Sequence, residues 1–300
     1  MLDAVIIGSG PAGLTAAIYA ERALLNSVVI EKNYLGTGQI SVTERVENYP
    51  GLFGISGFEL GEKFREQAIA LGAEIKEGEV TSINKSGNIW AVALSDGSVI
   101  ETKTVIYCAG ASHRRLGVKG DDKQKISYCA VCDGAFYKGK TVAVIGGGDT
   151  ALGDALYLSN IAETVYLIHR RNEFRANKSL QEKVRERDNI KLILEAVLDE
   201  VTGNEKADGI IYTQKGEQKK LGLDGIFCAI GSAPNTKLLE GVCDLDERGY
   251  VIAGEDTATS APGLFAAGDV RTTPLRQVIT AAADGARAIA FAEEYINTLS

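Results

Sequence analysis

The chain has 300 residues, about twice the usual length of one domain, and its 45% hydrophobic and 24% charged residues exclude a disordered or collagen-like protein. A net charge of −8 argues against a nucleic-acid-binding protein, which would usually carry a basic face. No apolar run approaches the roughly 18 residues of a membrane span, and the first strand begins almost at once, so we expect a cytoplasmic protein with no export signal, membrane or nucleic-acid partner.

The first half of the chain alternates apolar strands with a helix, a pattern typical of a parallel sheet buried on both faces. It begins with a predicted strand over 4–7, a glycine-rich turn over 8–13, a helix over 14–23 and a returning strand over 28–30. Three meander strands over 79–85, 89–94 and 98–102 and a last strand over 105–110 are predicted to follow. This order predicts one nucleotide-binding fold with a small β-meander before its last strand.

The second half repeats the same order. It begins with a predicted strand over 141–145, a glycine-rich turn over 146–151, a helix over 152–159 and a returning strand over 164–168. Three meander strands over 198–202, 209–214 and 217–221 and a last strand over 225–231 are predicted to follow. After residue 241 come a strand that ends in Gly268-Asp269 and a long helix from about Pro274 to Tyr295, with proline at its start. This tail has no glycine-rich loop of its own, so we expect it to complete the first domain.

The predicted fold is therefore α/β, with two Rossmann-like dinucleotide-binding domains, each with a small β-meander, and the second inserted into the first. The first domain is expected to comprise residues 1–112 and 242–300, and the inserted domain residues 113–241.

The first glycine-rich turn, Gly8-x-Gly10-x-x-Gly13, lies between a predicted strand and helix. Glycines there permit a tight turn and let backbone N–H groups approach a pyrophosphate at the helix N-terminus. Glu31 ends the next strand, about twenty residues on, where an acid binds ribose hydroxyls. The pattern indicates a nucleotide with an unphosphorylated ribose, such as FAD or NAD. A purely structural glycine turn and a solvated Glu31 are the alternatives.

The second turn, Gly146-x-Gly148-x-x-Ala151, has the alanine that the fingerprint permits at its third position. The strand that follows ends in HRRNEFR over 169–175 instead of an acid. Three arginines there suit a 2′-phosphate, which arginine can clamp with two hydrogen bonds, so the pattern favours NADPH. The alternatives are a solvated basic loop or inter-domain salt bridges, and for His169 a packed ring.

The segment CAVCDG at 129–134 contains a CxxC motif, which can be half of a zinc site, a structural disulfide or a redox dithiol. Zinc needs two further ligands at matching spacing, whereas Cys108, Cys228 and Cys243 are isolated and the chain has only two His. A redox dithiol beside a flavin accounts for the CxxC and both dinucleotide sites together. Asp133 could then hold or donate the proton that thiol–disulfide exchange moves, or simply form the turn that follows.

Together these residues resemble the low-molecular-weight, bacterial-type thioredoxin reductases over essentially the whole chain. The resemblance rests on six segments, GSGPAG at 8–13, VENYPG at 46–51, CAVCDG at 129–134, HRRNEFR at 169–175, AAGDV at 266–270 and RQ at 276–277. It implies a homodimeric flavoenzyme in which NADPH reduces FAD, the flavin reduces the Cys129–Cys132 disulfide, and the dithiol reduces a thioredoxin.

The resemblance also implies roles for single residues. Cys132 would be the flavin-facing thiol, Cys129 the thiol that attacks the partner, and Asp133 the acid–base residue. The positions that would contact FAD are Gly8, Ser9, Gly10, Pro11, Ala12, Gly13, Glu31, Gly38, Gln39, Asn48, Val80, Ala109, Gly110, Gly268, Asp269, Arg276, Gln277 and Val278. The positions that would contact NADPH are Gly148, Asp149, Thr150, His169, Arg170, Arg171, Arg175 and Ile230. The crossings near 111–115 and 233–242 would be hinges between the domains.

The chain departs from the family pattern in places. Gly153-Asp154 stands where the helix after the second turn usually carries paired acids. The Gly-Arg-Gly that usually precedes the CxxC is missing, and its arginine helps to dock thioredoxin in the family. Lys123 and Lys125 are candidates to replace that arginine.

Two other functions remain as alternatives. One is a related flavin disulfide reductase that takes electrons from ferredoxin or passes them to another CxxC protein. Such ferredoxin-fed enzymes lose the pyridine-nucleotide motifs, whereas the arginine cluster over 169–175 is intact. The other is a non-catalytic redox sensor, which would bind nucleotide without turning over a dithiol acceptor.

Overall fold

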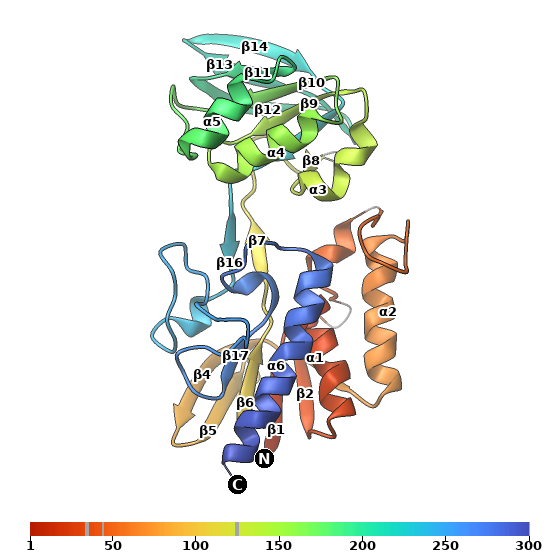
Figure 1. The fold of residues 1–300 in the computed structure, drawn as a ribbon, viewed down its shortest axis with the longest axis vertical. Coiled ribbons are helices and arrows are strands. Elements are labelled where there is room, and N and C mark those ends of the chain that lie inside the picture. The colour runs from red at the N-terminus through yellow and green to blue at the C-terminus, as the bar shows by residue number, and fades with distance from the viewer. Residues whose placement is uncertain (34–35, 44, 124–125, 300) are drawn as a thin grey trace. The chain divides into compact units, whose positions relative to one another are not determined.

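The computed structural model describes residues 1–33, 36–43, 45–123 and 126–299. The chain forms two compact units, one made of Met1–Ser112 with Ala233–Ser300 and the other of His113–Ser232 (Figure 1). The sequence predicts the inserted unit to end at residue 241, whereas it ends at 232. Asn235 is held in the first unit because its backbone N–H donates to the Gly110 carbonyl at 3.0 Å and its side-chain amide donates to the Ala109 carbonyl at 2.7 Å.

The first unit is built on a seven-stranded sheet in the order β3-β2-β1-β6-β5-β4, with β17 also paired to β6. Its strands are β1 (Leu2–Ile7), β2 (Ser27–Glu31), β3 (Glu74–Glu77), β4 (Val80–Ser86), β5 (Ile89–Leu94), β6 (Val99–Tyr107) and β17 (Leu264–Ala266). β1 pairs in parallel with β2 and β6, and β4 and β5 add an antiparallel meander. The prediction of separate strands over 98–102 and 105–110 is wrong, because Thr102-Lys103-Thr104 offers β-branched residues and no breaker, so β6 is continuous.

Helices cover this sheet (Figure 1). They are α1 (Pro11–Arg22), α2 (Gly57–Ala70) and α6 (Val278–Thr298), with the short helices η1 (Gln39–Val42), η3 (Lys237–Leu239) and η4 (Gly268–Val270). α6 begins four residues after the predicted start at Pro274, because Gln277 and Thr280 form a capping box that sets its first turn. α6 packs closely on α1, where a Cβ on Gly285 would lie 2.1 Å from the Ala12 carbonyl oxygen.

The second unit has a five-stranded parallel sheet in the order β11-β10-β9-β15-β8 and a separate three-stranded sheet, β12-β13-β14. The strands are β8 (Ile126–Ser127), β9 (Thr141–Ile145), β10 (Thr164–Ile168), β11 (Ile190–Ile193), β12 (Ala196–Gly203), β13 (Ala207–Gln214), β14 (Glu217–Gly222) and β15 (Gly225–Cys228). Its helices are α3 (Ala130–Asp133), η2 (Gly134–Tyr137), α4 (Asp149–Ser159) and α5 (Lys178–Arg185). Here the meander is a sheet of its own, because the chain turns at Asp224, whose carboxylate accepts the Thr141 N–H at 2.9 Å.

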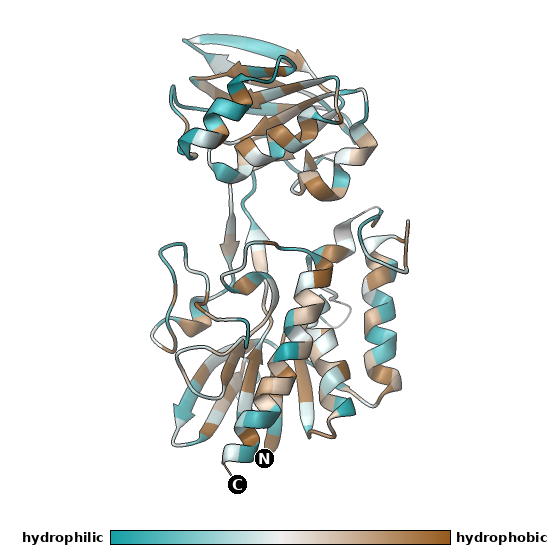
Figure 2. Ribbon diagram, in the orientation of Figure 1, coloured by the Kyte–Doolittle hydropathy of each residue, from teal (hydrophilic) through white to brown (hydrophobic). Residues whose placement is uncertain are grey.

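The two chain crossings, β7 (Ala111–His113) and β16 (Ser232–Pro234), pair with each other as a two-stranded sheet. Figure 2 shows apolar residues concentrated along the central strands of each unit and a hydrophilic edge at β14. Within the described part of the chain, none of the helices combines the length and apolar character needed to cross a membrane.

Candidate functional site

The first glycine-rich turn joins β1 to α1. Gly8 has φ +101°, and a Cβ there would lie 2.6 Å from the Cys108 carbonyl oxygen; a Cβ on Gly13 would lie 1.8 Å from the carbonyl oxygen of Gly8. The fold therefore requires glycine at both positions. Gly10 differs, because the nearest atoms to its Cβ position are 3.8 Å away, and as N-cap of α1 it places no side chain over the helix end. The backbone at Gly10 is thus free to approach a pyrophosphate.

Glu31 lies beside this turn. Its carboxylate accepts the Ser9 N–H at 2.8 Å, the Ser9 hydroxyl at 2.9 Å and the Asn33 N–H at 3.0 Å. The Ser9 hydroxyl also contacts the Gly36 carbonyl. The end of β2 therefore brings the acid to the place where the fingerprint expects a ribose-binding residue.

Two other predicted FAD positions, Gly38 and Gly268, pack against the same turn from distant parts of the sequence. Gly38, with φ +77°, packs so closely that its Cβ would lie 3.0 Å from the Gly10 Cα. Gly268, with φ +79°, would place a Cβ 3.0 Å from the Ala12 Cβ. Ala109 and Gly110 follow β6, which pairs with β1. Pro11 is the first residue of α1, Val80 the first of β4 and Val278 the first of α6.

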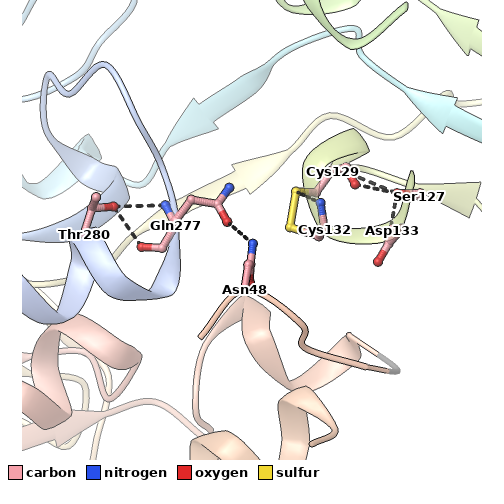
Figure 3. The surroundings of a disulfide bond; sticks show 7 residues. All are labelled: Asn48, Ser127, Cys129, Cys132, Asp133, Gln277 and Thr280. Atoms are coloured by element: carbon pink, nitrogen blue, oxygen red, sulfur yellow. Dashed lines mark hydrogen bonds between the residues drawn. A yellow bond between two sulfur atoms is a disulfide. The ribbon is translucent and has the colours of Figure 1, made fainter. Parts of the chain in front are cut away.

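Several polar residues of the predicted FAD set contact other groups of the first unit. The Asn48 side-chain amide donates to Gln277 Oε1 at 2.9 Å (Figure 3), and the Gln39 amide donates to the Ala111 carbonyl. The Arg276 guanidinium lies 4.2 Å from the centroid of the Tyr250 ring. Burial raises the pKa of Asp269, and the charge of Arg276 opposes that rise.

A buried ion pair supports the turn at Gly268, and the sequence analysis does not identify it. Arg271 donates from Nε to Asp284 Oδ2 at 2.8 Å and from Nη2 to Oδ1 at 3.0 Å. Asp284 also accepts the Gly268 N–H at 3.1 Å, while Arg271 Nη1 donates to three backbone carbonyls. The available signal in the sequence is an acid that interrupts the run of small residues early in α6.

In the second glycine-rich turn, between β9 and α4, one glycine is again required by close packing and another leaves the helix N-terminus open. A Cβ on Gly146, with φ +156°, would lie 2.4 Å from the Ala229 carbonyl oxygen, so the fold requires glycine there. A Cβ on Gly148 would meet nothing within 4 Å, and no side chain caps α4 at this residue. The Asp149 carboxylate accepts the N–H of Asn177, the N-cap of α5, at 2.8 Å. The N-terminus of α4 is therefore open to a phosphate, while Asp149 is tied to α5.

His169 packs against the second turn. It is only 9% exposed, and a Cβ on Gly147 would lie 2.3 Å from its ring. The ring stacks on Phe174, with centroids 5.6 Å apart. Burial lowers the pKa of His169, the neighbouring arginines lower it further, and a hydrogen bond to the Glu173 backbone opposes them. These effects favour a neutral ring at physiological pH, and Nε2 has no hydrogen-bond partner among the described residues.

The other predicted NADPH positions lie on the surface of the second unit. Arg170, Arg171 and Arg175 are exposed, and over the described ranges none of them takes part in an ion pair. Thr150, in the first turn of α4, is exposed, and Ile230, just after β15, is 38% exposed. The three guanidinium groups are therefore available to an anion.

The CxxC lies in the second unit, after β8. Cys129 and Cys132 form a disulfide, and the Cys132 N–H donates to Cys129 Sγ at 3.2 Å (Figure 3). The Ser127 hydroxyl donates to Asp133 Oδ2 at 2.6 Å and accepts the Cys129 N–H at 3.1 Å. Asp133 is thus held at the CxxC turn by a hydroxyl that the sequence analysis does not single out.

The remaining cysteines are free thiols. Burial raises the pKa of Cys108, and it raises those of Cys228 and Cys243 to about 11. These thiols are therefore protonated and unreactive at neutral pH. Among the described residues, no group of three or more His, Cys, Asp or Glu side chains is arranged to hold a metal ion.

Of the two lysines suggested as substitutes for a docking arginine, Lys123 donates to the Asn204 carbonyl at 3.1 Å. Lys125 lies outside the described residues. The structure therefore ties the Lys123 ammonium to its own unit.

Comparisons with known proteins show which family the chain resembles. The family described as pyridine nucleotide-disulphide oxidoreductase matches residues 2–285. The thioredoxin reductase of Treponema pallidum is 41% identical, with 99% of this chain and 98% of that protein covered. The bifunctional thioredoxin reductase/thioredoxin of Mycobacterium leprae is 42% identical over 98% of this chain, which spans 66% of that longer protein.

Solved structures show the same likeness. The crystal structure of thioredoxin reductase from Streptococcus pyogenes matches with a TM-score of 0.94 at 39% identity, covering 99% of each chain. Thioredoxin reductase from Giardia duodenalis matches with a TM-score of 0.91 at 35% identity, again over 99% of each chain. The chain therefore belongs to the pyridine nucleotide-disulphide oxidoreductase family and, within it, to the bacterial-type thioredoxin reductases.

Proposed function

We propose that this chain is an NADPH-dependent flavoprotein that reduces the disulfide of a thioredoxin through Cys129 and Cys132. The observation that carries this proposal is the CxxC disulfide with Asp133 held beside it, in a chain that also presents two open glycine-rich turns. When bound, FAD accepts a hydride from NADPH and supplies two electrons to the disulfide.

The two units offer different nucleotide sites. In the first, the open backbone at Gly10 and the N-terminus of α1 would hold the FAD pyrophosphate, with Glu31 at the ribose. In the second, Gly148 and the N-terminus of α4 would hold the pyrophosphate of NADPH. The exposed guanidinium groups over 170–175 would bind its 2′-phosphate, which NADH lacks.

The dithiol chemistry belongs to the chain itself. Two electrons break the Cys129–Cys132 bond, and of the two protons taken up, one goes to the Cys132 sulfur and one is held by Asp133, so that Cys129 is left as a thiolate. The Cys129 thiolate attacks a sulfur of the partner's disulfide; a mixed disulfide forms, and the departing partner sulfur takes a proton that Asp133 would deliver. Cys132 then attacks the Cys129 sulfur and restores the enzyme disulfide, and the second partner sulfur leaves with the proton that Cys132 gives up. The Cys132 N–H directed at Cys129 Sγ stabilises negative charge on the attacking sulfur.

The name of the Mycobacterium leprae relative, which joins a thioredoxin reductase and a thioredoxin in one protein, supports thioredoxin as the acceptor. Family membership also supports a homodimer in the cytoplasm. Light scattering on the purified flavoprotein tests the dimer, which requires a mass near twice the 31.9 kDa of the chain.

The first experiment is an anaerobic titration with NADPH and, separately, NADH, in which flavin absorbance is followed. We expect near-stoichiometric bleaching by NADPH and much weaker bleaching by NADH. If dithionite bleaches the flavin but neither nucleotide does, the NADPH assignment fails and a ferredoxin-like donor must be sought. If NADPH bleaches the flavin but no dithiol acceptor turns over, the chain is a sensor instead of a reductase.

Single replacements locate the two halves of the reaction. Cys129→Ser and Cys132→Ser should each abolish thioredoxin reduction and leave flavin reduction by NADPH intact. Arg175→Ala should raise the KM for NADPH about tenfold, because one charge-assisted hydrogen bond contributes about 1.5 kcal/mol or more, and should leave the KM for NADH unchanged. Arg185→Ala is the charge-matched control, since Arg185 lies on α5 and bonds only to Gln181 among the described residues.

A further inference from the structure

Ser127 occupies an unusual place at the redox centre. It ends β8, where it pairs with Phe227 of β15, and it is only 6% exposed. Its hydroxyl donates to Asp133 Oδ2 at 2.6 Å, accepts the Cys129 N–H at 3.1 Å and lies 3.3 Å from the Cys129 carbonyl oxygen. One buried oxygen therefore lies within hydrogen-bond distance of the backbone N–H and the backbone carbonyl oxygen of Cys129 and of the carboxyl group of Asp133 (Figure 3).

We propose that Ser127 is a positioning residue of the dithiol reaction, whose hydroxyl holds the Asp133 carboxyl group in place both before and after Asp133 gives up its proton. The inference rests on the proposed function, because it assigns Ser127 a part in the proton transfer that accompanies thiol–disulfide exchange.

A hydroxyl group has one hydrogen and two acceptor lone pairs, so it can bond to Asp133 in either protonation state. When Asp133 is a carboxylate, the Ser127 O–H donates to Oδ2, and one lone pair accepts the Cys129 N–H. When Asp133 carries a proton, its own O–H can donate to the second lone pair of Ser127. The Ser127 hydrogen then turns to the Cys129 carbonyl oxygen, already 3.3 Å away.

Both protonation states of Asp133 thus keep the same neighbour at the same distance, and only one hydroxyl hydrogen rotates. In the step itself, protonated Asp133 gives its proton to the departing sulfur of the partner and becomes a carboxylate. No electrons pass through Ser127. The main chain of β8 fixes the hydroxyl, so the carboxyl group of Asp133 does not have to find a new partner during the reaction.

The test is Ser127→Ala, examined as the FAD-bound enzyme. Flavin reduction by NADPH should stay within twofold of wild type. Thioredoxin reduction should fall about tenfold or more. The basic limb of its pH profile, where Asp133 loses the proton that it delivers, should move to higher pH, because the hydroxyl binds the charged carboxylate more strongly than the neutral acid. A second readout needs no thioredoxin: the pH dependence of alkylation of the dithiothreitol-reduced CxxC by iodoacetamide, followed by mass spectrometry, should shift in the same variant.

Three comparisons make the test specific. In an Asp133→Ala background, Ser127→Ala should produce no further shift in the alkylation profile. Ser159→Ala is the control, since Ser159 is similarly buried at 8% exposure and its hydroxyl donates within α4 to the Leu156 carbonyl at 2.7 Å. If the Ser127→Ala variant does not fold, Ser127→Thr and Ser127→Val are compared instead, because threonine and valine have the same shape and differ only in the hydroxyl group.

The outcomes separate the two proposals. A wild type that does not reduce thioredoxin overturns the proposed function, while the alkylation profile still tests Ser127. The role of Ser127 is overturned if the wild type reduces thioredoxin and the variants without the hydroxyl have the same pH profile and the same alkylation profile as the wild type. A shift in the variants without a hydroxyl, absent from Ser127→Thr and Ser159→Ala, supports it.

Discussion

Replacing Asp284 with alanine tests how far a buried ion pair supports the first unit. Asp284 is 4% exposed and Arg271 is 7% exposed, and two hydrogen bonds join the carboxylate to the guanidinium. The replacement leaves a buried guanidinium without its counter-charge and removes the acceptor of the Gly268 N–H. Breaking such a pair costs about 3–5 kcal/mol, and we expect the free energy of unfolding of the first unit to fall by about that amount.

The single tryptophan makes the assay specific to this unit, because Trp90 lies in β5 and is 1% exposed. Urea unfolding followed by Trp90 fluorescence, with an m-value of about 2 kcal/mol per molar urea, should show the midpoint about 1.5–2.5 M lower in Asp284→Ala. FAD affinity should fall as well, since Gly268 precedes the predicted FAD contact Asp269.

Arg287→Ala is the matched control. Its guanidinium lies 3.9 Å from the same carboxylate, but its side chain is 50% exposed. Exposed pairs contribute about 0–1 kcal/mol, so this variant should unfold within 1 kcal/mol of wild type. Equal losses in the two variants, or a loss below about 1 kcal/mol in Asp284→Ala, would refute the reasoning.

Three further predictions concern the second unit, and the last two are measured by urea unfolding followed by circular dichroism. Gly147→Ala should lower NADPH affinity, measured by titration, because its Cβ would lie 2.3 Å from the His169 ring; unchanged affinity would contradict this packing. Gly153→Ala should stabilise the unit by about 0.5–1 kcal/mol, since a Cβ inside α4 would meet nothing within 4 Å, and a loss of stability would contradict that space. Burial raises the pKa of Asp154 from its usual 3.8 to about 7. The folded wild-type protein therefore loses stability as pH rises from about 4 to 7. The free energy of unfolding of Asp154→Asn should exceed that of wild type by about 1–4 kcal/mol above pH 7 and should match it near pH 4. A difference independent of pH would overturn this assignment.

Much of the fold could be read from the sequence because its signals are local. The glycine-rich turns at 8–13 and 146–151 each follow an apolar strand and open a helix, and the strands and helices form there. Boundaries were harder. β6 runs without a break where two strands were expected, and α6 begins at its capping box instead of at Pro274. β6 continues because its middle residues contain no breaker, and the capping pair Gln277 and Thr280 sets the start of α6, so neither boundary follows from the apolar pattern alone.

The candidate site divides in the same way. The motifs alone indicated two nucleotide sites and a CxxC, since each needs particular residue types at fixed spacing. Gly38 packs against Gly10, which lies 28 positions away in the sequence, and Arg271 pairs with Asp284, which lies 13 positions away. No rule of sequence spacing predicts either contact. Ser127 is an ordinary serine in the sequence.

The sequence by itself determined the chemistry, because cysteines, arginines and glycine turns carry their function in their side chains and backbone freedom. Only the tertiary structure decided which polar groups support that chemistry. A hydroxyl or a carboxylate takes its role from the partner that folding brings within about 3 Å, and that partner is chosen by the packing of whole strands and helices.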